Sequence, residues 1–195
     1  MVDIKRKNKP SWKIILGGSG GQGIITLSRV LAYAGISKRL NVSFLPVYGA
    51  EMRGGYVYSM LSFSTKEPVS PVISQVDIGV FMNEGSLQIL KQYLKKNEGW
   101  FLWNSSLIKP GKELRNNDIG IPASDVAEKI GTVKIANMVM LGGLLRILEK
   151  TGFPAEEKDI RYGLKETIKS PKDIQLNLLA ISEGKRLVDE ALING

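Results

Sequence analysis

The spacing of apolar positions predicts strands that alternate with helices along most of the chain. Residues 12–16 form a short apolar run, which is typical of a buried strand. The apolar positions within 24–34 recur as in a helix that is buried on one side. Apolar runs at 42–45, 77–83 and 100–103 indicate further strands. Such an alternation favours an α/β fold with a mainly parallel sheet.

The remaining segments complete one domain. Residues 56–64 alternate roughly between polar and apolar, as in a strand with one more polar face, and 119–122 fits a short edge strand. Helical spacing is found at 84–96, 125–130 (with Ser124 as its expected cap), 135–150, 156–169 and 172–192. Gly142 and Gly143 would let another backbone approach the helix at 135–150. The sequence predicts a single α/β domain over residues 1–195 with a helical C-terminal part.

A glycine-rich stretch between the first strand and the first helix has the pattern of a phosphate-binding turn. Gly18, Gly20 and Gly23 fit the G-x-G-x-x-G register. Glycine permits positive φ and lets amide groups approach an anion, and the helix behind it offers unpaired N–H groups. The same pattern also fits a tight turn that binds nothing. No acidic residue closes the strand at 42–45 to hold a ribose, so NAD is disfavoured.

A second unusual stretch, residues 46–55, combines a proline, three glycines, one acid and one base, and it predicts a sharply folded loop. Arg53 beside Gly54 can hold a phosphate or carboxylate in a bidentate fork, because its small neighbours clear the approach. Glu51 can line the entrance for the substrate or coenzyme together with Arg53, or it can simply pair with Arg53. The alternative is a long solvated connection.

Polar residues follow two of the predicted strands. Asn83 ends the third strand, and Asn104 and Ser105 end the next. In open α/β sheets, ligands lie beyond the carboxyl ends of the strands, so these side chains can line one rim. Helix capping explains Asn83 and Ser105 equally well, because Asn and Ser are strong N-cap residues.

Composition narrows the chemistry. The chain has no cysteine and no histidine, which excludes a thiolate nucleophile, a cluster held by its own thiolates and a Ser/His/Asp triad, and makes a zinc site untenable. Its 27 Lys and Arg against 19 Asp and Glu favour phosphorylated ligands or acidic partners. No nucleic-acid-binding motif is present, and no metal site, membrane segment or signal peptide is expected. Residues 1–11 are expected to be a flexible basic terminus, and the protein is expected to be cytoplasmic.

Taken in order, these stretches resemble the gamma subunit, or gamma domain, of the 2-oxoacid:ferredoxin oxidoreductases. The motifs that carry the resemblance are Gly18-Ser19-Gly20-Gly21-Gln22-Gly23 with Thr26, Pro46-Val47-Tyr48-Gly49-Ala50-Glu51-Met52-Arg53-Gly54-Gly55, Met82-Asn83, Asn104-Ser105 and Ala136-Asn137-Met138-Val139-Met140-Leu141-Gly142-Gly143. The match extends over nearly the whole chain, which makes it more specific than one glycine loop.

The resemblance implies a Rossmann-like domain that helps to form a coenzyme A site in a complex that oxidises a 2-oxoacid to acyl-CoA and reduces ferredoxin. Thiamine diphosphate, Mg and the Fe–S clusters would then be bound by alpha-, beta- and delta-type partner subunits. None of this chain's residues is expected to be catalytic. Within the family, the sequence of residues 46–55 is more similar to the subgroups that act on 2-oxoglutarate or a branched-chain oxoacid, which favours one of these as substrate.

The residues expected to contact coenzyme A, or the cofactor region of a partner, are Gly18, Ser19, Gly20, Gly21, Gln22, Gly23, Thr26, Tyr48, Glu51, Arg53, Gly54, Asn83, Asn104 and Ser105. Three alternatives stay open: a beta-type subunit of an indolepyruvate oxidoreductase, a purely structural docking subunit that touches no small molecule, and a free-standing nicotinamide or flavin oxidoreductase. A homodimer of the isolated chain is also left open.

Overall fold

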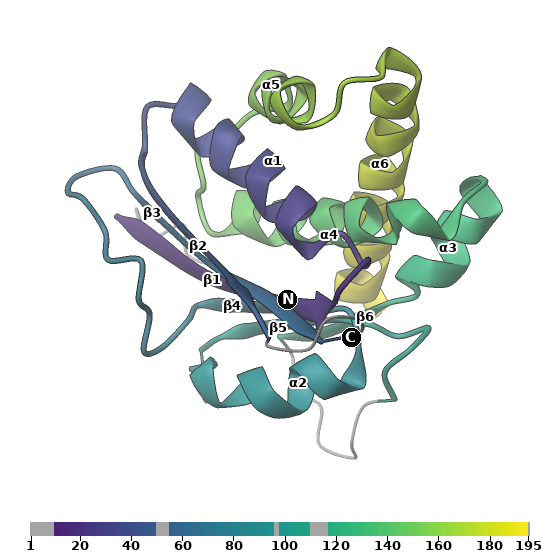
Figure 1. Ribbon diagram of the computed structural model, residues 1–195, viewed down its shortest axis with the longest axis horizontal. Coiled ribbons are helices and arrows are strands. Elements are labelled where there is room, and N and C mark those ends of the chain that lie inside the picture. The colour runs from purple at the N-terminus through teal and green to yellow at the C-terminus, as the bar shows by residue number, and fades with distance from the viewer. Residues whose placement is uncertain (1–9, 50–54, 96–97, 110–116, 195) are drawn as a thin grey trace.

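The computed structural model describes residues 10–49, 55–95, 98–109 and 117–194 (Figure 1). Its centre is a six-stranded sheet in the order β2-β3-β1-β4-β5-β6. The strands are β1 (Ser11–Ser19), β2 (Asn41–Tyr48), β3 (Tyr56–Ser64), β4 (Ile78–Phe81), β5 (Trp100–Asn104) and β6 (Asp118–Ile121). The neighbouring pairs β1–β4, β4–β5 and β5–β6 are parallel, whereas β3 runs antiparallel to both β1 and β2. The predicted α/β fold with a mainly parallel sheet is confirmed.

Helices cover the two faces of the sheet unequally. They are α1 (Ile24–Ser37), α2 (Glu84–Leu90), α3 (Ala123–Ile130), α4 (Ala136–Lys150), α5 (Glu157–Thr167) and α6 (Pro171–Asn194), with short 3₁₀ turns at Lys91–Tyr93 and Val133–Ile135. Of the described α-helices, α2 alone lies on one face, where Leu90 packs with Ile15 and Phe81. On the other face α1 and α4 cover the sheet, α5 packs on α1, and α6 crosses α4 (Figure 1).

Glycines set how closely the outer helices approach the inner ones. A Cβ at Gly184 of α6 would lie 1.9 Å from the carbonyl oxygen of Val139 in α4, and a Cβ at Gly142 would lie 2.1 Å from that of Ile181. A Cβ at Gly163 of α5 would lie 2.2 Å from the carbonyl oxygen of Val30 in α1. The expected close backbone approach at Gly142 is therefore present. These contacts fix α1 and α4, whose N-terminal ends both lie at the glycine loop.

A buried carboxylate fastens α5 to the end of α1. Asp159 is 2% exposed, and it accepts hydrogen bonds from the Ser37 hydroxyl at 2.7 Å and the Glu156 amide at 2.8 Å. Although burial raises the pKa of the Asp159 carboxyl, these hydrogen bonds and the charge of Lys38 together lower it below its ordinary value. The carboxylate thus stays ionised at neutral pH and anchors the outer helix.

Three boundaries differ from the sequence predictions. Pro46, Val47 and Tyr48 belong to β2 and not to a loop; β2 is an edge strand, which tolerates a proline that cannot donate a ladder hydrogen bond. Helix α2 ends at Leu90 and gives way to a 3₁₀ turn, although the spacing predicted a helix to residue 96. Ser11 of the expected flexible terminus already pairs with Ser64 in the sheet.

Candidate functional site

The glycine loop lies between β1 and α1 and is closed by its own hydrogen bonds. The Gln22 amide donates to the Ser19 carbonyl at 3.1 Å, and the Ser19 amide donates to the Gln22 side-chain Oε1 at 2.8 Å. The Gly20 amide donates to the Gly55 carbonyl at 3.2 Å, which ties the loop to the start of β3. Gly21 has φ +90°, a conformation that glycine adopts without strain. The loop therefore has a defined shape before any ligand binds.

The loop leaves one end of α1 open to an anion. Gly23 is the N-cap, with φ +72° and without a side-chain cap, and the first turn contains no acidic residue. The amides of Ile24, Ile25 and Thr26 have no acceptor within an α-helix that begins there, and the helix dipole is positive at this end. Gly20 and Gly21 are exposed, and a Cβ on either would meet no atom within 4 Å. These residues fit a phosphate group that approaches the backbone.

Asn83 joins the loop to α2. Its Nδ2 donates to the Ser19 Oγ at 2.6 Å and to the Gln22 Oε1 at 2.8 Å, while its Oδ1 accepts from the Ser86 amide at 2.8 Å. Asn83 is therefore the N-cap of α2, and the same side chain ties that helix to the glycine loop; its expected place on a ligand rim stays a prediction. Because the Gln22 Oε1 already accepts two hydrogen bonds, only the Nε2 of that side chain faces a ligand's acceptors.

Asn104 has an internal role, which corrects its expected place on the rim. It is fully buried, and its Oδ1 accepts from the amides of Ser106, Ala123 and Ser124 at 3.1–3.3 Å. Its Nδ2 donates to the Ser124 Oγ at 2.8 Å. Asn104 thus caps α3 from the neighbouring strand, and Ser124, expected as the cap, lies inside that helix.

Ser105 is exposed beyond the end of β5, and its amide donates to the Ile121 carbonyl at 2.8 Å. Its hydroxyl stays a predicted rim group. Glu51, Arg53 and Gly54 lie outside the described residues, so their expected roles at the entrance stay predictions.

A small apolar cavity adjoins the loop. It measures about 170 Å³ and lies between the ends of β2 and β3 and helix α2. Its walls include Tyr48, Tyr56 and Ile89, which are 65%, 43% and 41% exposed. Tyr56 is paired with Ser19 in the sheet, which places this apolar surface beside the glycine loop. Tyr48 therefore lies in this apolar surface together with two neighbours that were not predicted, and its contact with a ligand stays a prediction.

Asn137 is the residue of this region that sequence reasoning did not select. It is in the first turn of α4, 4% exposed, and its Nδ2 donates to the Gly23 carbonyl at 3.0 Å. A polar residue at the start of an otherwise apolar helix is a signal that the sequence contained. Its partner, 114 residues away along the chain, was not deducible from spacing.

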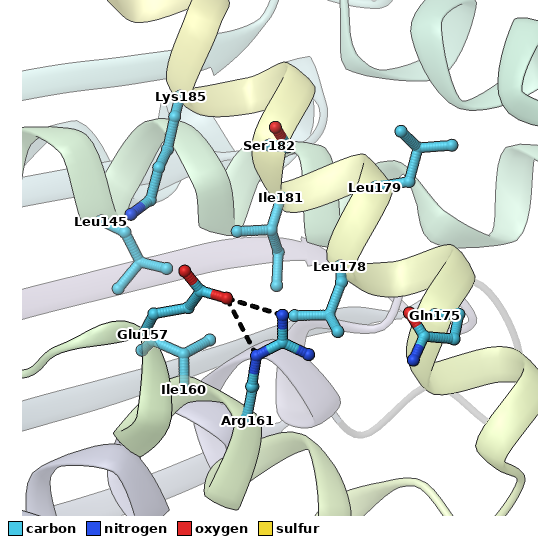
Figure 2. A pocket seen from close by; sticks show the side chains of 10 residues that line it. All are labelled: Leu145, Glu157, Ile160, Arg161, Gln175, Leu178, Leu179, Ile181, Ser182 and Lys185. Atoms are coloured by element: carbon cyan, nitrogen blue, oxygen red, sulfur yellow. Dashed lines mark hydrogen bonds and ion pairs between the residues drawn. The ribbon is translucent and has the colours of Figure 1, made fainter.

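A larger cavity, of about 410 Å³, lies between α5 and α6 over Leu145 of α4 (Figure 2). None of its lining residues belongs to the glycine loop. Its cations are already paired: Arg161 donates to Glu157 at 2.6 and 2.9 Å, and Lys185 lies 2.5 Å from Glu149. The charges of Arg161 and Lys185 are thus balanced by carboxylates, whereas no acidic residue lies in the glycine loop or the first turn of α1, so the glycine loop is the better candidate site for an anion.

Residues 17–23 contain no titratable side chain. Those described groups with clearly shifted pKa values, such as Lys38, Arg146 and Asp159, lie in ion pairs of the helical layer. The loop offers backbone donors, the Gln22 amide and the Ser19 hydroxyl, which can bind and orient a ligand but do not act as an acid or a base at neutral pH.

The model of the pyruvate ferredoxin/flavodoxin oxidoreductase family matches residues 13–187. The chain belongs to this family. The resemblance drawn from the glycine loop and the later motifs is thereby confirmed at the level of the family.

Several relatives differ in the substrate that they are named for. The ketoisovalerate oxidoreductase subunit VorA of Methanothermobacter thermautotrophicus is 32% identical over 90% of this chain and 36% of its own length. The 2-oxoglutarate synthase subunit KorC of Methanocaldococcus jannaschii is 30% identical over 95% of this chain and 98% of its own. The indolepyruvate oxidoreductase subunit IorB of Archaeoglobus fulgidus is 28% identical, with 88% and 92% covered. The chain thus spans about a third of the VorA relatives but nearly all of KorC and IorB.

Solved structures share the fold. A 2-oxoglutarate:ferredoxin oxidoreductase from Magnetococcus marinus, with 2-oxoglutarate, coenzyme A and succinyl-CoA bound, superposes with a TM-score of 0.81 at 24% identity over 93% of this chain and 32% of that one. The gamma subunit of a keto/oxoacid ferredoxin oxidoreductase from Geobacter sulfurreducens gives 0.77 at 21% identity over 94% and 99%. Among the described residues, no helix is long and apolar enough to cross a bilayer.

Proposed function

We propose that this chain is the gamma-type subunit of a 2-oxoacid:ferredoxin oxidoreductase and that its glycine loop helps to bind coenzyme A. The observation that carries the proposal is an exposed, preshaped glycine loop at the open N-terminus of α1, in a chain of this family. Coenzyme A carries phosphate groups, which suit backbone donors and a positive helix end. The Magnetococcus relative, whose structure contains coenzyme A, supports the choice of ligand.

The chemistry would be divided between chains. This chain has no cysteine and no histidine, so it can hold neither an Fe–S cluster through thiolates nor a histidine base. Alpha-, beta- and delta-type subunits would bind thiamine diphosphate, Mg and the clusters that pass electrons to ferredoxin. Thiamine diphosphate, when bound there, supplies the carbanion chemistry. The loop's part is to position coenzyme A through Gly20, Gly21, Gly23 and the first amides of α1.

The substrate proposed is 2-oxoglutarate or a branched-chain oxoacid. The VorA and KorC relatives support this choice, and the IorB relatives keep indolepyruvate as the alternative. A docking subunit without any small-molecule contact is a second candidate, favoured by the exposed Tyr48, Tyr56 and Ile89 beside the loop. A docking subunit would assemble in the same way, but substitutions in the loop would not change the KM for coenzyme A.

The complex isolated through a tag on this chain from its own cell should contain the thiamine- and cluster-binding subunits. It should reduce ferredoxin only when both a 2-oxoacid and coenzyme A are present. In a panel of 2-oxoglutarate, 2-oxoisovalerate, pyruvate and indolepyruvate, the highest kcat/KM should be found for one of the first two. A preference for indolepyruvate would overturn the substrate assignment alone, whereas recovery of the chain without such subunits would overturn the function.

A further inference from the structure

We infer that Asn137 is the positioning residue of the glycine-loop site: from α4 it orients the peptide at the start of α1, so that the amides there face the phosphate of coenzyme A. This inference rests on the proposed function. Asn137 itself is buried on the inner side of the loop and would not touch the ligand.

The contact acts on one peptide group. The Gly23 carbonyl accepts from the Asn137 Nδ2 at 3.0 Å and from the Leu27 amide at 3.0 Å, which uses both of its lone pairs. In a trans peptide the C=O and N–H bonds point in opposite directions. Holding the Gly23 carbonyl toward α4 therefore directs the Ile24 amide the opposite way, out of the start of α1.

The hydrogen bonds that close the loop join Ser19 to Gln22 and Gly20 to Gly55, and they do not reach this peptide. Gly20 and Gly21 have no neighbour that a Cβ would reach within 4 Å, and Gly23 has positive φ. A Cβ at Gly23 would lie 2.3 Å from the Asn137 Nδ2, so the amide packs directly on the glycine backbone. Besides the first hydrogen bond of α1, from the Leu27 amide, the Gly23–Ile24 peptide is therefore held by Asn137, a group outside the loop.

Helix α4 is suited to supply a fixed reference. It is held by α6 through backbone contacts at Gly142 and Gly184, which do not involve the loop. Arg146 of α4 also donates to Asp189 of α6 at 2.6 Å. Because the position of α4 is set independently, Asn137 imposes the orientation on the loop and does not merely follow it.

The test uses Asn137→Leu and Asn137→Ala in the assembled complex. Leu has nearly the same size and shape as Asn, cannot donate a hydrogen bond and adds no charge near the loop, and it has the higher helix propensity, so folding should be retained. Both variants should raise the KM for coenzyme A about tenfold, while kcat at saturating coenzyme A and the KM for the 2-oxoacid stay unchanged. The matched control is Asn177→Leu: Asn177 is 6% exposed and its Nδ2 donates to the Asp173 carbonyl at 2.7 Å within α6.

The outcomes separate this inference from the proposed function. If both Asn137 variants leave the KM for coenzyme A unchanged but Gly20→Glu raises it, the positioning role is wrong and the site stands. If none of these three variants changes the KM for coenzyme A, both the proposed coenzyme A site and the inference are overturned. If Asn177→Leu raises the KM for coenzyme A equally, or if the KM values for coenzyme A and the 2-oxoacid rise together with a loss of kcat, the effect of Asn137 is a general loss of structure and the inference is overturned.

Discussion

Replacing Gly184 by alanine should destabilise the chain by about 3 kcal/mol or more, the upper end of what overpacking costs. The added Cβ would lie 1.9 Å from the Val139 carbonyl oxygen and 3.0 Å from the Gly143 nitrogen. Both atoms are backbone atoms of α4, so no side chain can move aside, and α6 must separate from α4. The gain of about 1 kcal/mol in helix propensity from glycine to alanine does not offset this.

Thermal and denaturant unfolding of the purified chain measures the effect, with Gly20→Ala as the matched control. Gly20 is exposed, and a Cβ there meets nothing within 4 Å, so that variant should unfold almost as the native chain does. Equal unfolding midpoints for Gly184→Ala and the native chain would show that the two helices are not in backbone contact.

Substituting Gly20 by glutamate should raise the KM for coenzyme A at least tenfold in the assembled complex. The substitution adds a carboxylate beside the open end of α1, in a place with room for it. Two like charges about 4 Å apart repel by about 1 kcal/mol in water and by about 4 kcal/mol near a protein surface. Tenfold corresponds to about 1.4 kcal/mol, which lies within this range. The effect should weaken as salt is added, because exposed charges are screened.

The control for added charge is Gln175→Glu, at an exposed position that lines the cavity between α5 and α6. It changes the net charge by the same amount, away from the loop, and should leave the KM for coenzyme A unchanged. An equal rise in both variants would mean that general electrostatics, and not a site at the loop, governs the binding of coenzyme A. An unchanged KM in Gly20→Glu would favour the docking subunit.

Much of the fold was predictable because it depends on local periodicity. The apolar run at β1 and the helical spacing in α1 and α4 gave the right elements, since buried faces repeat with a fixed period. Pro46 misled the prediction because a proline indicates a loop unless its strand lies at a sheet edge. Which strand lies at an edge depends on the order of the whole sheet, and local pattern does not contain that order.

The site was predictable only in part, for the same reason. The glycine loop was recognisable because its residues are adjacent in the sequence, and Asn83 because it follows a strand. Asn104 and Asn137 are both buried asparagines that hold a backbone group of another element, one at α3 and one at Gly23. Composition and spacing did not distinguish these internal roles from ligand binding, because the partners are brought together only by the tertiary fold.

The most direct measurement is the CoA-dependent reduction of ferredoxin by the complex prepared without this chain, with this chain added back, and by this chain alone. A subunit that completes the coenzyme A site without reactive side chains of its own should restore activity to an inactive partner complex and should show none in isolation. Full activity of the complex that lacks this chain, or oxidation of a 2-oxoacid by this chain alone, would contradict the account.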